Sequence, residues 1–192
     1  MNDTAFIDAQ THQQVERGTS AATWDEVVID HTRSEYFQIG RNHRPAALWY
    51  AYEAGALTDP IEIAKGLEDA WTGAEWPERF LDRESWVEMF ESVGFVEDDH
   101  VGRRPKQSVT LYRAAVEDDR CGLAWTDDFD RAVWFHERNL SFGFDSKIWT
   151  VDVEPWSLLA HFRDSRNEAE WLWGGDSEDI RLAPIAEREV SK

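Results

Sequence analysis

The sequence predicts an α+β protein in which a helical region precedes a region rich in strands. The period of the apolar residues changes near residue 105, from three or four residues before that point to two residues after it. The 192 residues are 42% hydrophobic and include 11 Trp, which is typical of a folded chain and not of an acidic disordered one. We expect three segments: a flexible N-terminal tail over 1–20, a helical region over 21–107 and a strand-rich core over 108–192.

Helix start and stop residues divide the helical region into four expected helices. Thr23 and Glu26 have the spacing of a capping box. Asp59 and Pro60 are a favourable N-cap and a favourable first helical residue. Glycine after the last apolar position is the usual helix stop. We expect four helices: one after Thr23, one from Pro45 to Gly55, one after Asp59, and one from Asp82 to Gly94.

Alternating apolar and polar residues indicate strands in the second region. The clearest strand covers 148–153 and ends before Pro155, which has no backbone N–H to donate. Asp127 or Thr126 is expected to cap a helix over about 128–138. The expected strands cover 109–113, 122–125, 148–153, 170–173 and 180–182, and 156–160 is expected as a turn. Five tryptophans are expected in the core: Trp125, Trp134, Trp149, Trp171 and Trp173.

Charge and missing signals exclude several classes of protein. The chain has 20 Lys and Arg against 39 Asp and Glu, a net charge of −19, so a nucleic-acid partner is not expected. No apolar run approaches the ~20 residues that cross a bilayer, and the first residues do not resemble a signal peptide. The single Cys121 has no partner for an internal disulfide. We expect a soluble cytoplasmic protein without membrane contact.

Motifs of several common enzyme classes are absent from the sequence. There is no HExxH pair for zinc, no GxGxxG or GxxxxGK[ST] phosphate loop, and no GxSxG nucleophile turn. The acidic run Glu97–Asp99 beside His100 is interpreted as a solvated face. We therefore expect no metal site.

Four short segments form an ordered series after residue 107. The first is Leu111-Tyr112-Arg113, where a predicted strand ends in an arginine. The second is a short segment that ends in the hydroxyl-bearing residue Thr126. An acidic helix follows, and a loop then leads through Glu168 to Glu170 at the start of a strand. Over about 108–185 this order resembles the arginine–serine/threonine–glutamate class of mono-ADP-ribosyltransferases, the cholera-toxin-like enzymes, and most closely short bacterial and phage members. The resemblance implies a core of two small mixed or antiparallel sheets.

The resemblance also implies NAD as a substrate and a role for each motif. Glu170 would be the catalytic carboxylate, since cleavage of the nicotinamide bond builds positive charge on the ribose, as in glycoside hydrolysis. Glu168 would orient the acceptor, and a Glu-x-Glu pair is associated in the family with transfer to arginine. A planar guanidinium suits phosphate or ribose oxygens. The residues implied to contact NAD are Arg113, Trp125, Thr126 and Phe135.

Each of these residues also has a plain structural interpretation. Arg113 can form a surface ion pair, and Thr126 can cap the helix that follows. Trp125 and Phe135 can belong to the core. Where the family has a serine that bonds the catalytic glutamate, this chain has Ala124. Thr126 is the residue that can compensate; without compensation, activity is weak or lost.

The main functional prediction is therefore an NAD-dependent transfer of ADP-ribose to a protein side chain, with arginine favoured and nicotinamide released. The acidic chain suits a basic protein acceptor. Two alternatives stay open: an NAD glycohydrolase, in which water is the acceptor, and a non-enzymatic acidic protein that binds a basic partner on a degenerate transferase fold. The acceptor, the oligomeric state and the role of the helical region are not determined by the sequence.

Overall fold

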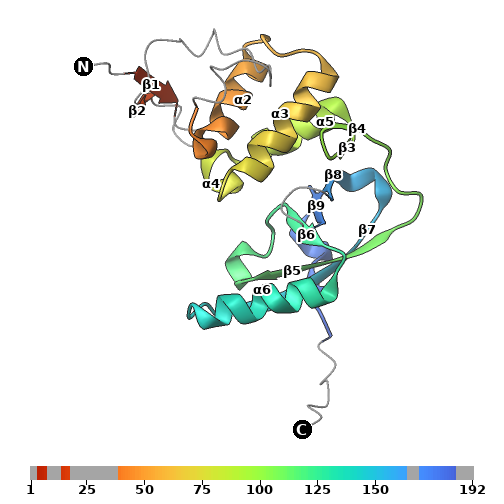
Figure 1. Ribbon diagram of the computed structural model, residues 1–192. Helices are drawn as coiled ribbons and strands as arrows, with labels where there is room; N and C mark the ends of the chain where they lie inside the picture. The colour runs from red at the N-terminus through yellow and green to blue at the C-terminus, as the bar shows by residue number, and fades with distance from the viewer. Residues whose placement is uncertain (1–3, 8–13, 18–38, 164–168, 185–192) are drawn as a thin grey trace.

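The α+β class is confirmed by the computed structural model, which describes residues 4–7, 14–17, 39–163 and 169–184 (Figure 1). The helix expected after Thr23 lies outside these residues. The helices of the described part are α2 (Arg44–Glu53), α3 (Pro60–Gly73), α4 (Pro77–Phe80), α5 (Arg83–Val93) and α6 (Phe129–Ser141). The strands are β1 (Thr4–Ile7), β2 (Gln14–Arg17), β3 (Val96–Glu97), β4 (His100–Val101), β5 (Val109–Ala115), β6 (Ala124–Thr126), β7 (Lys147–Val153), β8 (Leu158–Phe162), β9 (Glu170–Trp173) and β10 (Arg181–Leu182).

Local capping explains the ends of α3 and α5, as predicted. Asp59 accepts hydrogen bonds from the backbone N–H groups of Ile61 and Glu62, at 2.8 and 3.3 Å. Asp82 accepts from the backbone N–H of Ser85 at 2.8 Å. These contacts satisfy amide groups that have no partner within the first helical turn. Gly94 follows α5 with φ of 94°, a conformation that favours glycine.

Within the described residues the large sheet has eight strands in the order β10-β7-β5-β6-β9-β8-β3-β4. The pairing is antiparallel except between β3 and β8. The family resemblance implies two small sheets, whereas hydrogen bonding joins these eight strands into one mixed sheet. The join between β5 and β6 is a single residue pair, Tyr112 with Thr126. The strands β1 and β2 pair with each other outside this sheet, within the segment expected as a tail.

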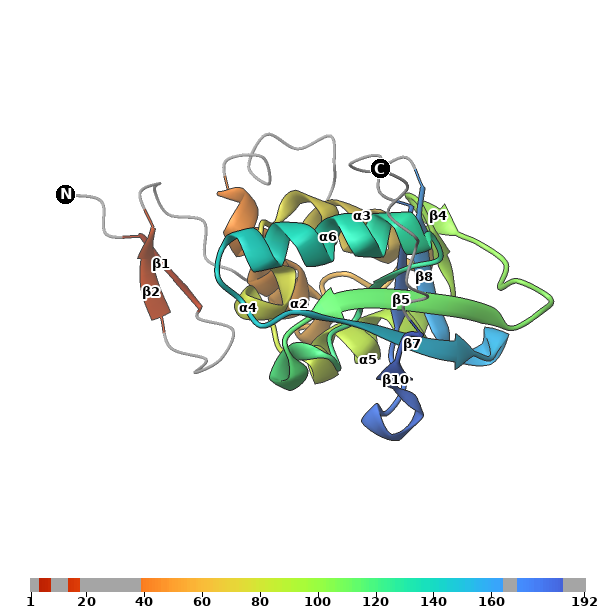
Figure 2. The ribbon, with the colours of Figure 1, turned by 90° about the horizontal axis from the view of Figure 1, so that it is seen from below.

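The core between the helices and the sheet combines residues from both regions. Trp71 and Trp86 are almost fully buried and meet edge to face, with centroids 5.1 Å apart. Phe90 packs on this pair from α5 and also contacts Phe162 of β8. Figure 1 shows α2–α5 gathered over β8, β9 and β3, and Figure 2 shows α6 running along β5. Burial of these side chains on both sides binds the two regions into one packed unit.

Three predictions in the strand-rich region are wrong, the first of them in part. The turn expected over 156–160 is limited to the short 3-10 helix Pro155–Ser157, and the strand β8 already begins at Leu158. All residues of β8 are buried, so the alternation that marks a half-exposed strand is missing. The cap of α6 is Asp128, whose Oδ1 accepts from the N–H groups of Asp130 and Arg131. Trp134 is 48% exposed on α6 and lies outside the core, whereas the other four predicted core tryptophans are buried.

None of the helices in the described part of the chain has the length and apolar character that a membrane crossing requires.

Candidate functional site

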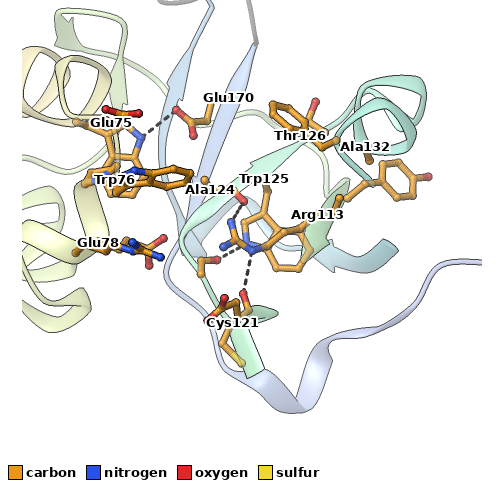
Figure 3. Close-up of a pocket in the computed structure, with 18 of the residues that line it drawn as sticks. Glu75, Trp76, Glu78, Arg113, Cys121, Ala124, Trp125, Thr126, Ala132 and Glu170 are labelled. Carbon is orange, nitrogen blue, oxygen red and sulfur yellow. Dashed lines mark hydrogen bonds between the residues drawn. The ribbon is translucent and has the colours of Figure 1, made fainter. Parts of the chain in front are cut away.

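A cleft of about 710 Å³ lies between α6 and the α3–α4 segment, with parts of β5, β6 and β9 as its floor. Figure 3 shows its side chains converging from the helical region on one side and from the sheet on the other. The lining residues belong to four groups: Trp71 and 75–79; 112–114; the loop and strand residues Asp118, Asp119, Cys121, Gly122 and 124–126; and Ala132, Phe135, Arg138 and Glu170. This volume is typical of a small-molecule site.

Thr126 and Glu170 lie directly opposite each other on paired strands. The β6–β9 register matches Thr126 with Glu170 and Ala124 with Leu172. Because directly paired residues point to the same face of a sheet, the hydroxyl and the carboxylate share the face that carries the cleft. Thr126 is only 7% exposed, and its Oγ1 accepts a hydrogen bond from the N–H of Asp128 at 3.1 Å.

The Glu170 carboxylate is held by a side chain from the helical region. Trp71 of α3 donates a hydrogen bond from Nε1 to Oε2 of Glu170, with a length of 2.9 Å. The dashed line from Glu170 in Figure 3 marks this bond. A strand start and a helix end therefore fix the carboxylate from two directions.

Arg113 supports the loop before β6. Its Nη1 donates to the carbonyl of Ala124 at 2.6 Å, and its Nε donates to the carbonyl of Asp119 at 3.1 Å. A side chain at position 122 would overlap its guanidinium, so the close approach requires Gly122. Burial lowers the pKa of Arg113, while Glu78 is first among the acids that oppose this shift. The group stays cationic because arginine does not lose its proton in proteins.

Trp125 and Phe135 lie at different depths. The β6 register places the Trp125 side chain on the face opposite Glu170, where its indole packs edge to face on Trp173 and donates to the carbonyl of Gly122 at 2.8 Å. Trp125 thus borders the cleft from below while its ring is part of the core. Phe135 is half-buried on α6 and faces the cleft, with the Arg131 guanidinium 5.6 Å from its ring centre.

The residues that form the helical wall of the cleft were not predicted from the sequence. Glu78 accepts the backbone N–H of Leu123 with both carboxylate oxygens at 3.1 Å, so α4 also supports the approach to β6. Trp76 is 52% exposed, with the guanidinium of Arg79 5.2 Å from its ring centre. The one available signal was the dense mixture of aromatic and charged residues over 71–79, which has no motif spacing.

The charges around the cleft are mixed. Three arginines contribute to its lining, at positions 79, 113 and 138, against the five acids Glu75, Glu78, Asp118, Asp119 and Glu170. Arg138 is also stacked on Trp134, with 5.6 Å to the ring centre. Cationic and acidic groups thus face one space, which allows an anionic and a cationic portion of one ligand to bind together.

The structure brings Arg113, Thr126, Phe135 and Glu170 to one cleft, with Trp125 at its base. Glu168 lies outside the described residues. Among the described residues, no three His, Cys, Asp or Glu side chains form a group that could hold a metal ion. Comparisons with protein-family models, with curated proteins and with solved structures find no match to this chain.

Proposed function

We propose that the protein is an NAD-dependent mono-ADP-ribosyltransferase with an ADP-ribosyltransferase-like core. One observation carries the proposal: Arg113, Thr126 and Glu170, chosen from the order of their motifs, line a single cleft. Thr126 and Glu170 are also paired across two strands.

The cleft residues fit the chemistry of NAD. A volume of about 710 Å³ falls within the usual range for ligands of this class. Arg79 and Arg138 provide guanidinium groups for a pyrophosphate. Tyr112 and Phe135 provide aromatic surface for planar rings. The residues present therefore suit a dinucleotide with anionic and aromatic portions.

The proposed roles follow from where each side chain is held. Glu170 stabilises the positive charge that develops on the ribose when its bond to nicotinamide breaks. Thr126, opposite it, offers its hydroxyl to the ribose. Arg113 keeps the 119–124 loop in place through two carbonyl oxygens, so its part in binding is to shape the cleft and add positive charge. Glu168 is proposed as the acid that orients the acceptor.

The proposed acceptor is a protein side chain, with arginine favoured by the Glu-x-Glu pair. The net charge of −19 attracts a basic protein and repels a nucleic acid. A basic acceptor also brings its own positive charge to a cleft with an excess of acids.

The test is incubation of the purified protein with NAD labelled on its adenylate portion and with a cell lysate, followed by mass spectrometry. We expect labelled protein and free nicotinamide, and a loss of about 100-fold or more in the Glu170→Gln variant. The control is Glu178→Gln, which changes an exposed carboxylate away from the cleft and retains full activity.

Two other outcomes identify the alternatives. Free ADP-ribose without labelled protein identifies a glycohydrolase. An absence of NAD binding in calorimetry, together with salt-sensitive binding to a basic protein, identifies a non-enzymatic acidic binding protein. Label transfer that survives Glu170→Gln undiminished overturns the assignment of Glu170.

A further inference from the structure

Trp71 is the helical-region side chain that contacts the proposed catalytic carboxylate. It lies 99 residues from Glu170 in the chain and reaches it through a 2.9 Å hydrogen bond. We infer that Trp71 is a positioning residue, whose indole N–H fixes the Glu170 carboxylate in the orientation that acts on the ribose. This inference rests on the proposed function and goes beyond it, because it makes the helical region a working part of the site.

The chemistry of the contact is directional. An indole nitrogen can only donate a hydrogen bond, so it supports an oxygen lone pair and cannot exchange roles with the carboxyl group. A bond to an ionised oxygen is shorter and stronger than a bond between neutral groups. With Oε2 held by Trp71, rotation of the carboxylate is restricted.

The donor itself cannot move easily. Trp71 is 2% exposed, and its ring is held edge to face by Trp86 at 5.1 Å and by Phe90 at 6.4 Å. Both neighbours belong to α5, so two helices fix the orientation of the indole. A rotation of Trp71 would require repacking of this aromatic cluster, which costs free energy in a dense core.

Glu78 and Arg83 also contact the second region, but their hydrogen bonds end on backbone groups, whereas the Trp71 bond ends on the Glu170 carboxylate. Glu78 bonds the N–H of Leu123, and Arg83 donates to the carbonyls of Cys121 and Gly175 at 2.8 Å each. These bonds fix backbone. The Trp71 bond ends on a reacting group, which separates a positioning effect from a general structural one.

The test compares Trp71→Phe with Trp86→Phe in the full-length protein. Both variants replace an indole by a phenyl ring in the same buried cluster, but Trp86 donates to the Pro77 carbonyl at 3.4 Å and does not line the cleft. For Trp71→Phe we expect kcat for nicotinamide release to fall about 10- to 100-fold, with KM for NAD changed less than about threefold. For Trp86→Phe we expect a similar loss of thermal stability and kcat within about threefold of the wild type.

A spectroscopic readout is independent of turnover. In the wild type, the indole N–H resonance of Trp71 in ¹⁵N-labelled protein shifts as the Glu170 carboxyl titrates. In Glu170→Gln that shift disappears, while it persists in Trp86→Phe. Replacement of Trp71 by 3-benzothienylalanine, which keeps the ring shape and lacks the N–H, reproduces the low kcat without the cavity of phenylalanine.

The outcomes separate the inference from the proposed function. A wild-type protein that releases no nicotinamide from NAD overturns both. An active wild type with kcat unchanged in Trp71→Phe overturns the inference and leaves the proposed function standing. Equal losses of kcat in both tryptophan variants show a structural effect and also overturn the inference.

Discussion

The helical region and the strand-rich region contribute to the cleft in different ways. Local signals mark the starts of α3 and α5 and the end of α5, and the inward side chains of both helices have the pattern of an ordinary core. The strands supply residues that read as functional from their motif order, such as Arg113 and Glu170. In the structure, the motif arginine supports a loop, whereas the core tryptophan Trp71 bonds the proposed catalytic carboxylate. One side chain of this protein can therefore belong to the core and line the cleft at the same time.

A shared core is the physical reason for this. The cluster that contains Trp71 and Trp86 also contains Phe162 and Leu172 from the sheet. Side chains that close this core on the helical side necessarily approach the face that carries Glu170.

The largest effect is expected for Trp86→Ala, which tests whether the two regions fold as one unit. Trp86 is fully buried. We expect a loss of about 3–5 kcal/mol in the free energy of unfolding, because a large cavity opens in the shared core. Urea unfolding measures the loss, and hydrogen exchange should show less protection in both α5 and β8–β9. Loss of protection in α5 alone would contradict this prediction, because it would show that the two regions unfold independently.

Glu78→Ala tests the polar link between α4 and the sheet region. The variant leaves the N–H of Leu123 without its carboxylate partner, at a cost of about 1–3 kcal/mol. Glu78→Gln keeps an acceptor and should cost less. Glu88→Ala, at an exposed position in α5, is the control and should stay within about 0.5 kcal/mol of the wild type. Equal effects at positions 78 and 88 in chemical denaturation would contradict this link.

Helix caps should behave alike in the two regions. Asp59 caps α3 and Asp128 caps α6, each through two backbone N–H groups. We expect Asp59→Ala and Asp128→Ala each to lower the free energy of unfolding by about 1 kcal/mol, because a cap acts over one helical turn. The matched Asp→Asn variants retain the acceptor and should be nearly neutral. A much larger effect at Asp128, measured by thermal unfolding, would show that this cap also supports the cleft.

The smallest effect concerns His161, whose ring stacks on Trp171 with centroids 3.6 Å apart. Burial lowers the pKa of His161, and Arg163 adds to this effect. Three acids oppose it: Asp127, Asp98 and Glu97. The unfolded chain therefore binds the proton more readily, so the free energy of unfolding falls as the pH drops below 6.5 towards the lowered pKa of the folded protein.

His161→Phe keeps a ring for the stack and removes the titrating group. We expect the free energy of unfolding to become less dependent on pH between about 5 and 6.5, while the values above pH 7 change little. Urea unfolding of the wild type and of His161→Phe at a series of pH values measures this dependence. An unchanged pH dependence in His161→Phe would show that other groups cause it.

Much of the fold could be predicted from the sequence, but the candidate site only in part. The caps at Asp59 and Asp82, the stop at Gly94 and the strand over 148–153 all depend on neighbours within a few residues, and these predictions are confirmed. The strand β8 was not predicted, because its burial on both faces removes the alternation of apolar and polar residues. Trp134 was misplaced because an apolar side chain on an amphipathic helix gives no sign of which flank faces solvent.

From the sequence alone we could predict the α+β class, the starts of α3 and α5, the end of α5, and the set of motif residues that includes Arg113, Thr126 and Glu170. These depend on short-range hydrogen bonding and on periodicity. Only the tertiary structure decided that Thr126 and Glu170 face each other, because strand register depends on pairing between distant segments. It also decided that Trp71 reaches Glu170, since that contact requires helix α3 to pack on the sheet across 99 residues of chain.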